Sequence, residues 1–241
     1  MNEKYWYLKR CPVFSDLSPE QLQTVESSCY AREFSRGEMI YLPSDHGDSV
    51  MLLARGRVRV YHVTHEGKQA ILGFVEPGEL FGELSAFNGS RREEYAEAME
   101  KTLVVLMPRA VVQRLMQQHP GVSIRLTSLF GLRLKRVERR LKSLLFRSSR
   151  ERLVHLLLEL AEKYGRRTED GVLIAQKISH QDMASIIGAT RETVTITLGE
   201  LQSEGILQIN RRRITLKDCD GLALATDFGP LTAAFSSCPA G

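Results

Sequence analysis

Cysteines are few in this 241-residue sequence, and they are scattered. Cys11, Cys29, Cys219 and Cys238 stand singly, without a Cys-x-x-Cys pair or a cysteine–histidine pair at ligand spacing. Zinc sites and iron–sulfur clusters take their protein ligands from such closely spaced residues. The sequence therefore predicts no metal site and no iron–sulfur cluster. Free thiols in a reducing compartment are expected, and a redox role for Cys11 or Cys29 is left open.

Long apolar runs are also missing. No stretch approaches the roughly 20 apolar residues that a membrane-spanning helix needs. The first ten residues, MNEKYWYLKR, include an early acid and lack the apolar core of a secretion signal. The hydrophobic share of 43% and the charged share of 26% are typical of a globular chain with one large or two modest domains. We expect a cytoplasmic protein with no membrane partner.

The motifs of common enzymes are absent as well. The sequence has no Gly-x-Ser-x-Gly nucleophile motif and no phosphate-binding loop of the P-loop type. Its histidines do not pair with a nucleophile at a recognisable spacing. His46, His62 and His65 stand singly, and a lone histidine is more often structural or exposed than a haem ligand. We expect that the chain is not an enzyme.

The stretch from Ser179 to Leu207 is the most informative part of the chain. It predicts two short helices joined by a tight turn. Ser179, three residues before Asp182, has the position of an N-cap, and Gly188 suits a turn with positive φ. A second helix is predicted to begin near Thr190 and to run to about Ser203. This pattern is typical of a helix-turn-helix.

The second helix has an apolar side and a polar N-terminal end. Val194, Leu198 and Leu201 have the spacing of a buried helix face, whereas Arg191 and Glu192 fall in the first turn. The following segment, ILQINRRRITL, reads as a strand, a basic turn and a second strand, which is the wing of a winged helix-turn-helix. An ordinary helical hairpin with a solvated first turn is the alternative, and the basic wing disfavours it.

Short strands are predicted upstream. Residues 8–30 predict a helical lead-in, and from about residue 32 to residue 108 short β-type runs alternate with glycine-containing turns, among them residues 65–68. Such spacing indicates a β-sandwich or jelly roll. Residues 166–171, far downstream, are expected to form a turn-rich loop.

A short helix ending before Pro120 and a long amphipathic helix over residues 122–146 should follow. The long helix carries an apolar seam with spacings of four, three, four and three residues: Phe130, Leu134, Val137, Leu141 and Leu144. This is the a/d pattern of two paired helices. Packing of the same seam against the β-type region is the alternative.

The net charge of +4 is unevenly distributed. One basic group lies in the second half of the long helix and just after it: Arg133, Lys135, Arg136, Arg139, Arg140, Lys142, Arg147, Arg150 and Arg152. A second group is the triplet 211–213. Both suggest a phosphate-binding surface, although a solvated helix face accounts for several members of the first group. For the triplet beside the helix-turn-helix we favour DNA.

Several motifs in order support a family resemblance. Phe34-x-x-Gly37-Glu38, the run 53–60 and the run 77–84 look like the β-roll motifs of a cyclic-nucleotide-binding domain. Residues 191–194, Arg-Glu-Thr-Val, resemble the recognition helix of the cAMP receptor protein/FNR (CRP/FNR) family of bacterial transcription regulators. Each motif is weak alone, but their order along most of the chain is specific.

The resemblance implies an α+β fold. In it, an N-terminal cyclic-nucleotide-binding-like β-roll (jelly roll) is followed by a long dimerisation helix and a C-terminal winged helix-turn-helix. The implied boundaries are 1–118 for the sensor domain, 119–146 for the dimerisation helix, 147–223 for the DNA-binding domain and 224–241 for a flexible tail.

The resemblance also implies a function. It implies a homodimer that binds double-stranded DNA at a palindromic site, acts with RNA polymerase and is controlled by an effector sensed in the β-roll. Arg191 and Glu192 would read bases, and Ile196 stands where the family often has a third reader, an arginine. Candidates for phosphate contact are Ser179, His180, Gln181, Thr193, Arg211 and Arg212. The alternative is a signalling module whose β-roll regulates a protein partner without specific DNA binding.

The effector pocket departs from the family pattern. Gly82, Glu83 and Leu84 match the family's Gly-Glu-Leu, whose glutamate holds the ribose, but the phosphate-binding Arg-Ser or Arg-Thr pair is replaced by Arg91-Arg92-Glu93-Glu94. A carboxylate at Glu93 would repel a cyclic phosphate and remove a donor. The two side chains of Arg92 and Glu93 are expected to pair on the surface. The sequence therefore disfavours cAMP and cGMP, and it leaves an organic acid, haem with a gas, or no ligand open.

Overall fold

The computed structural model describes residues 3–210 and 213–226. The chain divides into two compact units, one ending at Arg136 and one beginning at Val137. The expectations for Arg211, Arg212, Cys238 and most of the tail therefore lie outside the described residues. We describe each unit by itself.

Helices open the first unit, as expected for residues 8–30. They are α1 (Glu3–Arg10), the 3-10 turn η1 (Pro12–Phe14) and α2 (Pro19–Ser27). Ser18 caps α2 through a capping box with Gln21, and Pro19 occupies the first turn, where its missing N–H costs nothing. These local signals explain why the lead-in was predictable.

Two antiparallel four-stranded sheets form the β-roll. The first has the order β1 (Tyr30–Phe34), β8 (Thr102–Pro108), β3 (Ser49–Arg55) and β6 (Leu80–Phe81). The second has the order β2 (Met39–Tyr41), β7 (Tyr95–Ala98), β4 (Val58–Val63) and β5 (Gln69–Val75). The expected hairpin turn joins β4 to β5, with Gly67 at φ +78°.

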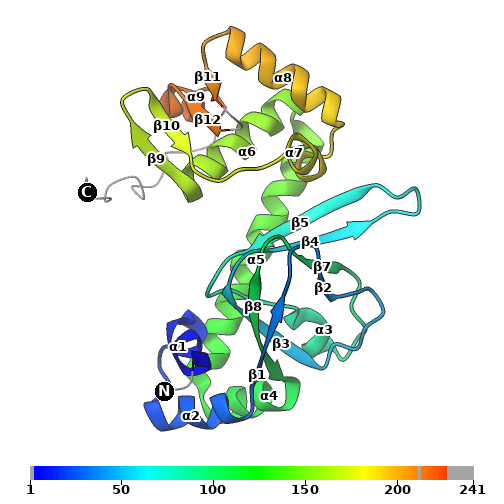
Figure 1. The fold of residues 1–241 in the computed structure, drawn as a ribbon, viewed down its shortest axis with the longest axis vertical. Coiled ribbons are helices and arrows are strands. Elements are labelled where there is room, and N and C mark those ends of the chain that lie inside the picture. The colour runs from blue at the N-terminus through cyan, green and yellow to red at the C-terminus, as the bar shows by residue number, and fades with distance from the viewer. Residues whose placement is uncertain (1–2, 211–212, 227–241) are drawn as a thin grey trace. The chain divides into compact units, whose positions relative to one another are not determined.

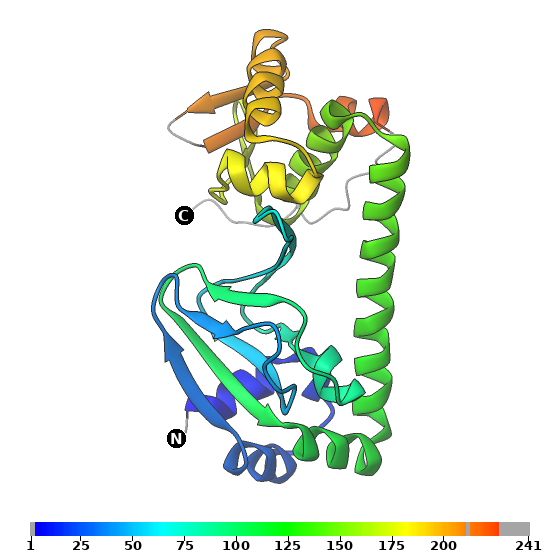
Figure 2. The same cartoon turned by 90° about the vertical axis from the view of Figure 1, so that its right-hand side faces the viewer.

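Strand β3 shows how the layers arise. Its side chains alternate, so Met51 and Leu53 face a core shared with the second sheet, whereas Val50 and Leu52 face a core shared with the helices. The helix-side core includes residues of α1, α2, α4 (Arg109–Gln118) and the first part of α5 (Pro120–Phe146). Figures 1 and 2 show these helices gathered at one end of the β-roll.

Helix α5 begins two residues before the expected start and ends at the expected Phe146. Only Val122 and Leu126 of this helix are fully buried. Phe130 of the predicted seam packs against the β-roll through Phe87. The other seam side chains are exposed large hydrophobics, at 62% for Leu134, 61% for Val137, 55% for Leu141 and 50% for Leu144.

The second unit is built around α6 (Ser149–Tyr164), which starts with a capping box of Ser148 and Glu151. Leu153, Leu157 and Leu158 of α6 form the centre of its core, and α7, α8 and the sheet cover them. The remaining elements are β9 (Gly165–Thr168), β10 (Gly171–Ile174), α7 (His180–Ile187), α8 (Arg191–Ser203), β11 (Leu207–Asn210), β12 (Arg213–Leu216) and α9 (Cys219–Ala225). The four strands form one sheet of order β11-β12-β10-β9.

One local prediction in this unit was wrong. Residues 166–168, expected in a loop, form strand β9 and pair with β10. Strand β9 lies at the edge of the sheet and its side chains from Arg166 to Thr168 are exposed. An exposed edge strand buries no alternating apolar face, so the sequence carries no period-two signal for it.

Candidate nucleic-acid interface and candidate effector pocket

Helices α7 and α8 form the predicted helix-turn-helix, joined by a short turn (Figures 1 and 2). Ser179 caps α7: its Oγ accepts from the Asp182 N–H at 3.0 Å and donates to Asp182 Oδ2 at 2.7 Å. Gly188 ends α7 in the left-handed conformation, with φ +66°. Thr190 then caps α8 by accepting from the Thr193 N–H at 3.2 Å.

The apolar faces of the two helices are buried together. Ala184 of α7 is fully buried, which permits a close crossing, and Val194, Leu198 and Leu201 of α8 are buried as predicted. The tertiary structure therefore fixes which face of α8 is left outside. That face carries Arg191, Glu192, Thr195 and Ile196, all exposed.

The charge state of Glu192 suits an acceptor. Hydrogen bonds from its own backbone N–H and from the Thr190 side chain lower the pKa of the Glu192 carboxyl. The group is thus a carboxylate at neutral pH, and a carboxylate accepts hydrogen bonds from a cytosine amino group. Ile196 is 62% exposed and presents a methyl surface without a donor.

A contact that sequence reasoning missed ties the first turn of α7 to the exposed face of α8. His180 Nδ1 lies 2.8 Å from Thr195 Oγ1, and Thr195 donates its own hydroxyl hydrogen to the Arg191 carbonyl at 2.9 Å. Because that hydrogen is already used, Nδ1 is the donor to Thr195. No motif predicted this pair, which depends on how the two helices cross.

Like His180, the other described residues predicted to contact phosphates already have partners within the motif. The hydroxyl of Ser179 belongs to the α7 cap, and the hydroxyl of Thr193 lies 3.0 Å from that of Thr190. Gln181 is exposed and donates weakly to Ser185 Oγ at 3.5 Å. The structure thus brings Ser179, His180 and Gln181 to one helix start, while Arg211 and Arg212 lie outside the described residues.

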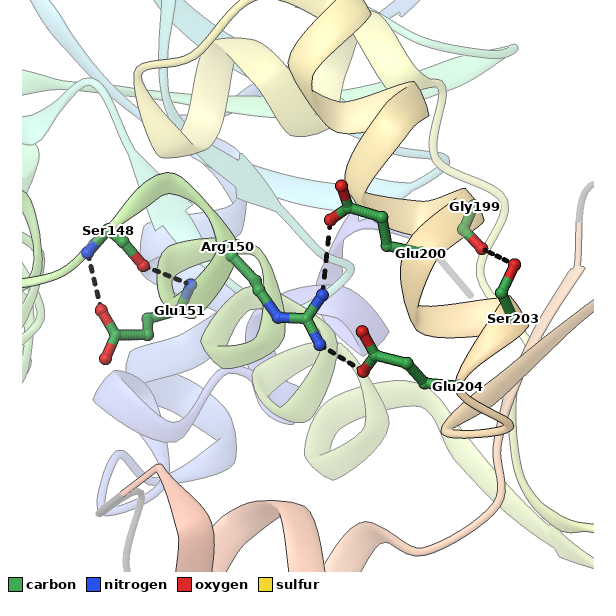
Figure 3. A network of polar contacts seen from close by, with 7 residues as sticks. All are labelled: Ser148, Arg150, Glu151, Gly199, Glu200, Ser203 and Glu204. Atoms are coloured by element: carbon green, nitrogen blue, oxygen red, sulfur yellow. Dashed lines mark hydrogen bonds and ion pairs between the residues drawn. The ribbon is translucent and has the colours of Figure 1, made fainter.

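Arg150 of α6 forms ion pairs with two glutamates at the C-terminal end of α8. Figure 3 shows this side chain extending from α6 to Glu200 in the last turn of α8 and to Glu204, the residue that caps its C-terminal end. The capping box of Ser148 and Glu151 fixes the α6 start from which it extends. Arg150, counted among the basic residues for a phosphate surface, is therefore committed to two carboxylates of its own chain.

The candidate effector pocket contains a buried carboxylate. Glu83, the first residue of α3 (Glu83–Asn88), is 1% exposed. One of its oxygens forms an ion pair with Arg133 of α5, which also donates to the Leu80 carbonyl. The other oxygen, Oε2, is buried and has no hydrogen-bond partner. Leu84, the next residue, is 61% exposed.

The expected surface pair of Arg92 and Glu93 is not formed. Arg92 is 3% exposed, and it donates to the Gly82 carbonyl at 2.8 Å and to the Ser49 carbonyl at 2.9 Å. Its guanidinium carbon also lies 4.2 Å from the centre of the Tyr41 ring. Glu93 is exposed, because the packed interior takes the arginine and leaves the neighbouring carboxylate in solvent.

The position of the Arg92 side chain explains why residue 82, directly before Glu83, is a glycine. Gly82 has φ +67°, and a Cβ added there would lie 2.5 Å from Arg92 Nη1. The neighbouring Arg91 is exposed and donates to the Ser44 carbonyl at 3.0 Å. The structure thus brings Gly82, Glu83 and Arg92 together, whereas Leu84 and Arg91 stay at the surface.

Other candidate chemistry has little support among the described residues. Burial raises the pKa of the Cys11 thiol to about 11 and that of Cys29 to about 12, so neither is a reactive thiolate at neutral pH. His46, His62 and His65 are exposed. Within residues 3–210 and 213–226, no three histidine, cysteine or acidic side chains cluster as metal ligands. In the same ranges no helix has the length and apolar character to cross a membrane.

Comparison with known families supports both parts of the chain. The profile of the cyclic nucleotide-binding domain matches residues 31–119, and that of the Crp-like helix-turn-helix domain matches residues 151–225. Among relatives, the global nitrogen regulator of Synechocystis is 31% identical over 206 residues, covering 85% of this chain and 89% of the relative. The cyclic AMP receptor protein of Thermus thermophilus is 29% identical over 211 residues, covering 88% of this chain and 94% of the relative.

Solved structures have the same fold. A mutant of CooA from Carboxydothermus hydrogenoformans superimposes with a TM-score of 0.74 at 25% identity, covering 89% of this chain and 94% of CooA. FixK2 from Bradyrhizobium japonicum gives a TM-score of 0.71 at 26% identity, covering 81% of this chain and 96% of FixK2. The β-roll, the long helix and the C-terminal helix-turn-helix therefore form the α+β arrangement that the sequence predicted.

Proposed function

Because the chain belongs to the CRP/FNR family of DNA-binding transcription regulators, we propose that it binds a specific palindromic DNA site as a homodimer. The observation that carries the proposal is the exposed N-terminal end of α8. Arg191, Glu192 and Ile196 lie outside, while the opposite face of the helix is buried. In a helix-turn-helix this end enters the major groove.

Each exposed residue has a distinct task in the proposal. Arg191 donates two hydrogen bonds to O6 and N7 of a guanine, and Glu192 accepts from the amino group of a cytosine. Ile196 contacts a thymine methyl group and reads no donor or acceptor. Ser179, His180, Gln181 and Thr193, with Arg211 and Arg212 of the wing, contact phosphates and fix the register.

The exposed seam of α5 supports the homodimer. An apolar stripe from Leu134 to Leu144 at a/d spacing is costly to leave in water, and the same stripe of a second copy covers it. Two helix-turn-helix units related by a twofold axis then address two half-sites about one DNA turn apart. Within the chain, we propose residues 1–118 as the sensor, 119–146 as the dimerisation helix and 147–223 as the DNA-binding domain.

Cyclic nucleotides are not the effector in this proposal. Arg92, at the position of the family's phosphate-binding arginine, donates hydrogen bonds from both its terminal nitrogens to carbonyls of its own chain. The charge of Glu83 is already balanced by Arg133, and the exposed carboxylate of Glu93, next to Arg92 in the chain, adds a negative charge that would repel a phosphate. One relative is a global nitrogen regulator and another a cyclic AMP receptor protein, so similarity to them does not single out cyclic AMP as the effector.

Other functions have weaker support. A signalling module that regulates a protein partner would leave the polar end of α8 and its caps without a role. The matched relatives are regulators rather than enzymes. We include RNA polymerase among the proposed partners, because a regulator bound beside a promoter acts on transcription through it, and we propose the cytoplasm as the location.

The test is in-vitro selection of bound sequences from random duplex DNA, with and without cAMP. We expect one palindrome under both conditions. The same palindrome found only with cAMP would retain the regulator and overturn the effector argument. Absence of any enriched sequence, together with capture of a protein partner by residues 1–146 alone, would favour the signalling module.

A further inference from the structure

Two contacts join α3 to α5, one turn apart on each helix. Glu83 and Phe87 of α3 are four residues apart, and Phe130 and Arg133 of α5 are three apart, so each pair shares one helix face. The rings of Phe87 and Phe130 meet edge to face with centroids 6.0 Å apart. Glu83 forms the ion pair with Arg133. We call these four side chains the α3–α5 clamp.

The charges of the clamp depend on each other. Glu83 is 1% exposed, and a carboxylate at this depth is strongly disfavoured unless a cation neutralises it. Arg133 supplies that cation from a side chain that is 31% exposed, and it is held in place by the Leu80 carbonyl. The ion pair therefore fixes one turn of α5 against the β-roll.

The neighbouring groups leave little for a ligand to satisfy. Arg92 has its carbonyl partners and its place on the Tyr41 ring. Only Glu83 Oε2 is buried without a partner in this cluster. A cyclic phosphate would have to compete with the Gly82 and Ser49 carbonyls for the donors of Arg92. The charge of Glu83 is already balanced by Arg133 of the same chain.

We propose that the α3–α5 clamp takes the place of a small-molecule effector, so that the protein binds its DNA site without any added ligand. The inference rests on the DNA-binding function proposed above. Helix α5 is continuous from the clamp through the exposed seam to Phe146, just before α6. Arg133 is thus a positioning residue, because it holds the turn of α5 that comes directly before the exposed seam, the proposed dimer surface.

The test uses the full chain and four variants. Glu83→Gln/Arg133→Met removes both charges, so that no unpaired charge stays buried, and Arg133→Met leaves the carboxylate alone. Arg133→Lys keeps the cation. Arg114→Met is the matched control, because Arg114 is an exposed arginine on α4 of the same unit. Native mass spectrometry first establishes that the purified protein carries no bound small molecule.

Two readouts are compared: the Kd for the selected DNA, with and without millimolar cAMP or cGMP, and amide hydrogen exchange over residues 120–136. We expect ligand-free wild type to bind DNA and cyclic nucleotides to change nothing. The double variant should stay folded, exchange faster in α5 and bind DNA about tenfold more weakly, a usual size for coupling between sites. Arg133→Lys should recover part of the loss, and Arg114→Met should match the wild type.

Different failures have different signatures. A wild-type protein that binds DNA only with a bound small molecule would overturn the proposal, as would a double variant with wild-type Kd. A third outcome is that hydrogen exchange in α5 differs between wild type and double variant but no DNA sequence is selected. The DNA-binding function would then be wrong, and so would the proposal that the clamp replaces an effector. Equal exchange in both proteins would overturn the clamp itself.

Discussion

At the scale of single residues, the proposed function divides DNA recognition among three unlike side chains on the outer face of α8. Among the residues that the structure describes, none forms a hydrogen bond or ion pair with the Arg191 guanidinium, in contrast to Arg150, which is held between two glutamates. The free donors of Arg191 and its place in the first turn suit a base edge. Arg191→Ala should therefore cost about 1–3 kcal/mol of binding free energy at the preferred site and relax the preference for one base in each half-site.

The measurement is the Kd for the selected palindrome and for variants with that base changed, at fixed salt. Arg114→Ala, on the exposed side of α4 in the first unit, is the control for loss of one positive charge. A uniform loss over all sequences would assign Arg191 to phosphate contact instead.

Ile196 supplies the converse prediction. It is 62% exposed and lies one turn after Glu192 on the same face. Ile196→Arg adds donors where the wild type has only methyl groups, so a guanine should replace the preferred base at one position of each half-site. Repeating the selection experiment with this variant measures the change. An unchanged sequence would mean that residue 196 does not face the bases.

The buried thiols give a residue-scale prediction that is independent of DNA. Burial raises the pKa of Cys11 to about 11 and that of Cys29 to about 12, so both stay protonated in the folded protein until the pH approaches those values. Because the thiolate is the nucleophile, peptides that contain these cysteines should resist iodoacetamide at pH 8 and react after unfolding in guanidinium. Rapid native alkylation, followed by mass spectrometry, would contradict this and reopen a redox role.

At the scale of elements, the turn between α7 and α8 depends on one backbone conformation. Gly188 has φ +66°, and an added Cβ would meet Leu144 Cδ2 at 3.3 Å. Gly188→Ala should destabilise the second unit by about 1 kcal/mol or more, from left-handed strain alone. The matched control is Gly199→Ala in α8, where an added Cβ meets nothing within 4 Å. This substitution should stabilise the helix by about 1 kcal/mol, because alanine has a higher helix propensity than glycine.

Urea unfolding followed by circular dichroism compares the two alanine variants with the wild type. Equal shifts of the midpoint in the same direction would show that neither the left-handed conformation nor the helix interior matters at these sites. We expect opposite shifts.

The elements also show which features a sequence can predict. The bounds of α7 and α8 were predictable because their signals are local: Ser179 and Thr190 cap the starts, and Gly188 ends the first helix. Strand β9 was not, because its exposed edge leaves no alternating pattern. Arg133 was hidden among nine basic residues of one region, since its partner Glu83 is fifty residues away in sequence and only the fold brings them together.

The same limit explains the error at Arg92. An arginine followed by a glutamate has the same sequence whether the two side chains pair in solvent or the arginine is buried and the glutamate exposed. Arg92 is buried because it contacts three residues from other segments: Tyr41, Ser49 and Gly82. Because those contacts join the loop before β7 to distant segments of the fold, no spacing rule in the segment 91–94 reveals them.

At the scale of the whole molecule, the proposed function needs two copies, and the exposed seam of α5 is the surface on which that requirement can be tested. Leu134 and Leu132 offer a matched pair on one helix, exposed to 62% and 63%. Leu134 belongs to the a/d seam, whereas Leu132 is two residues away and lies on the far side of the helix. Because the two side chains are equally exposed in the single chain, a different effect of the two substitutions on dimerisation would come from contact with the second copy.

Leu134→Glu places two unpaired carboxylates in an interface between helices, a cost of several kcal/mol that corresponds to a dimer Kd raised on the order of a hundredfold or more. Leu132→Glu should leave the dimer intact. Sedimentation equilibrium measures both, and binding to full and half palindromes gives the consequence: the Leu134 variant should lose the advantage of the full site. If both variants stay dimeric with equal preference for the full site, the two copies meet through another surface and α5 has a different role.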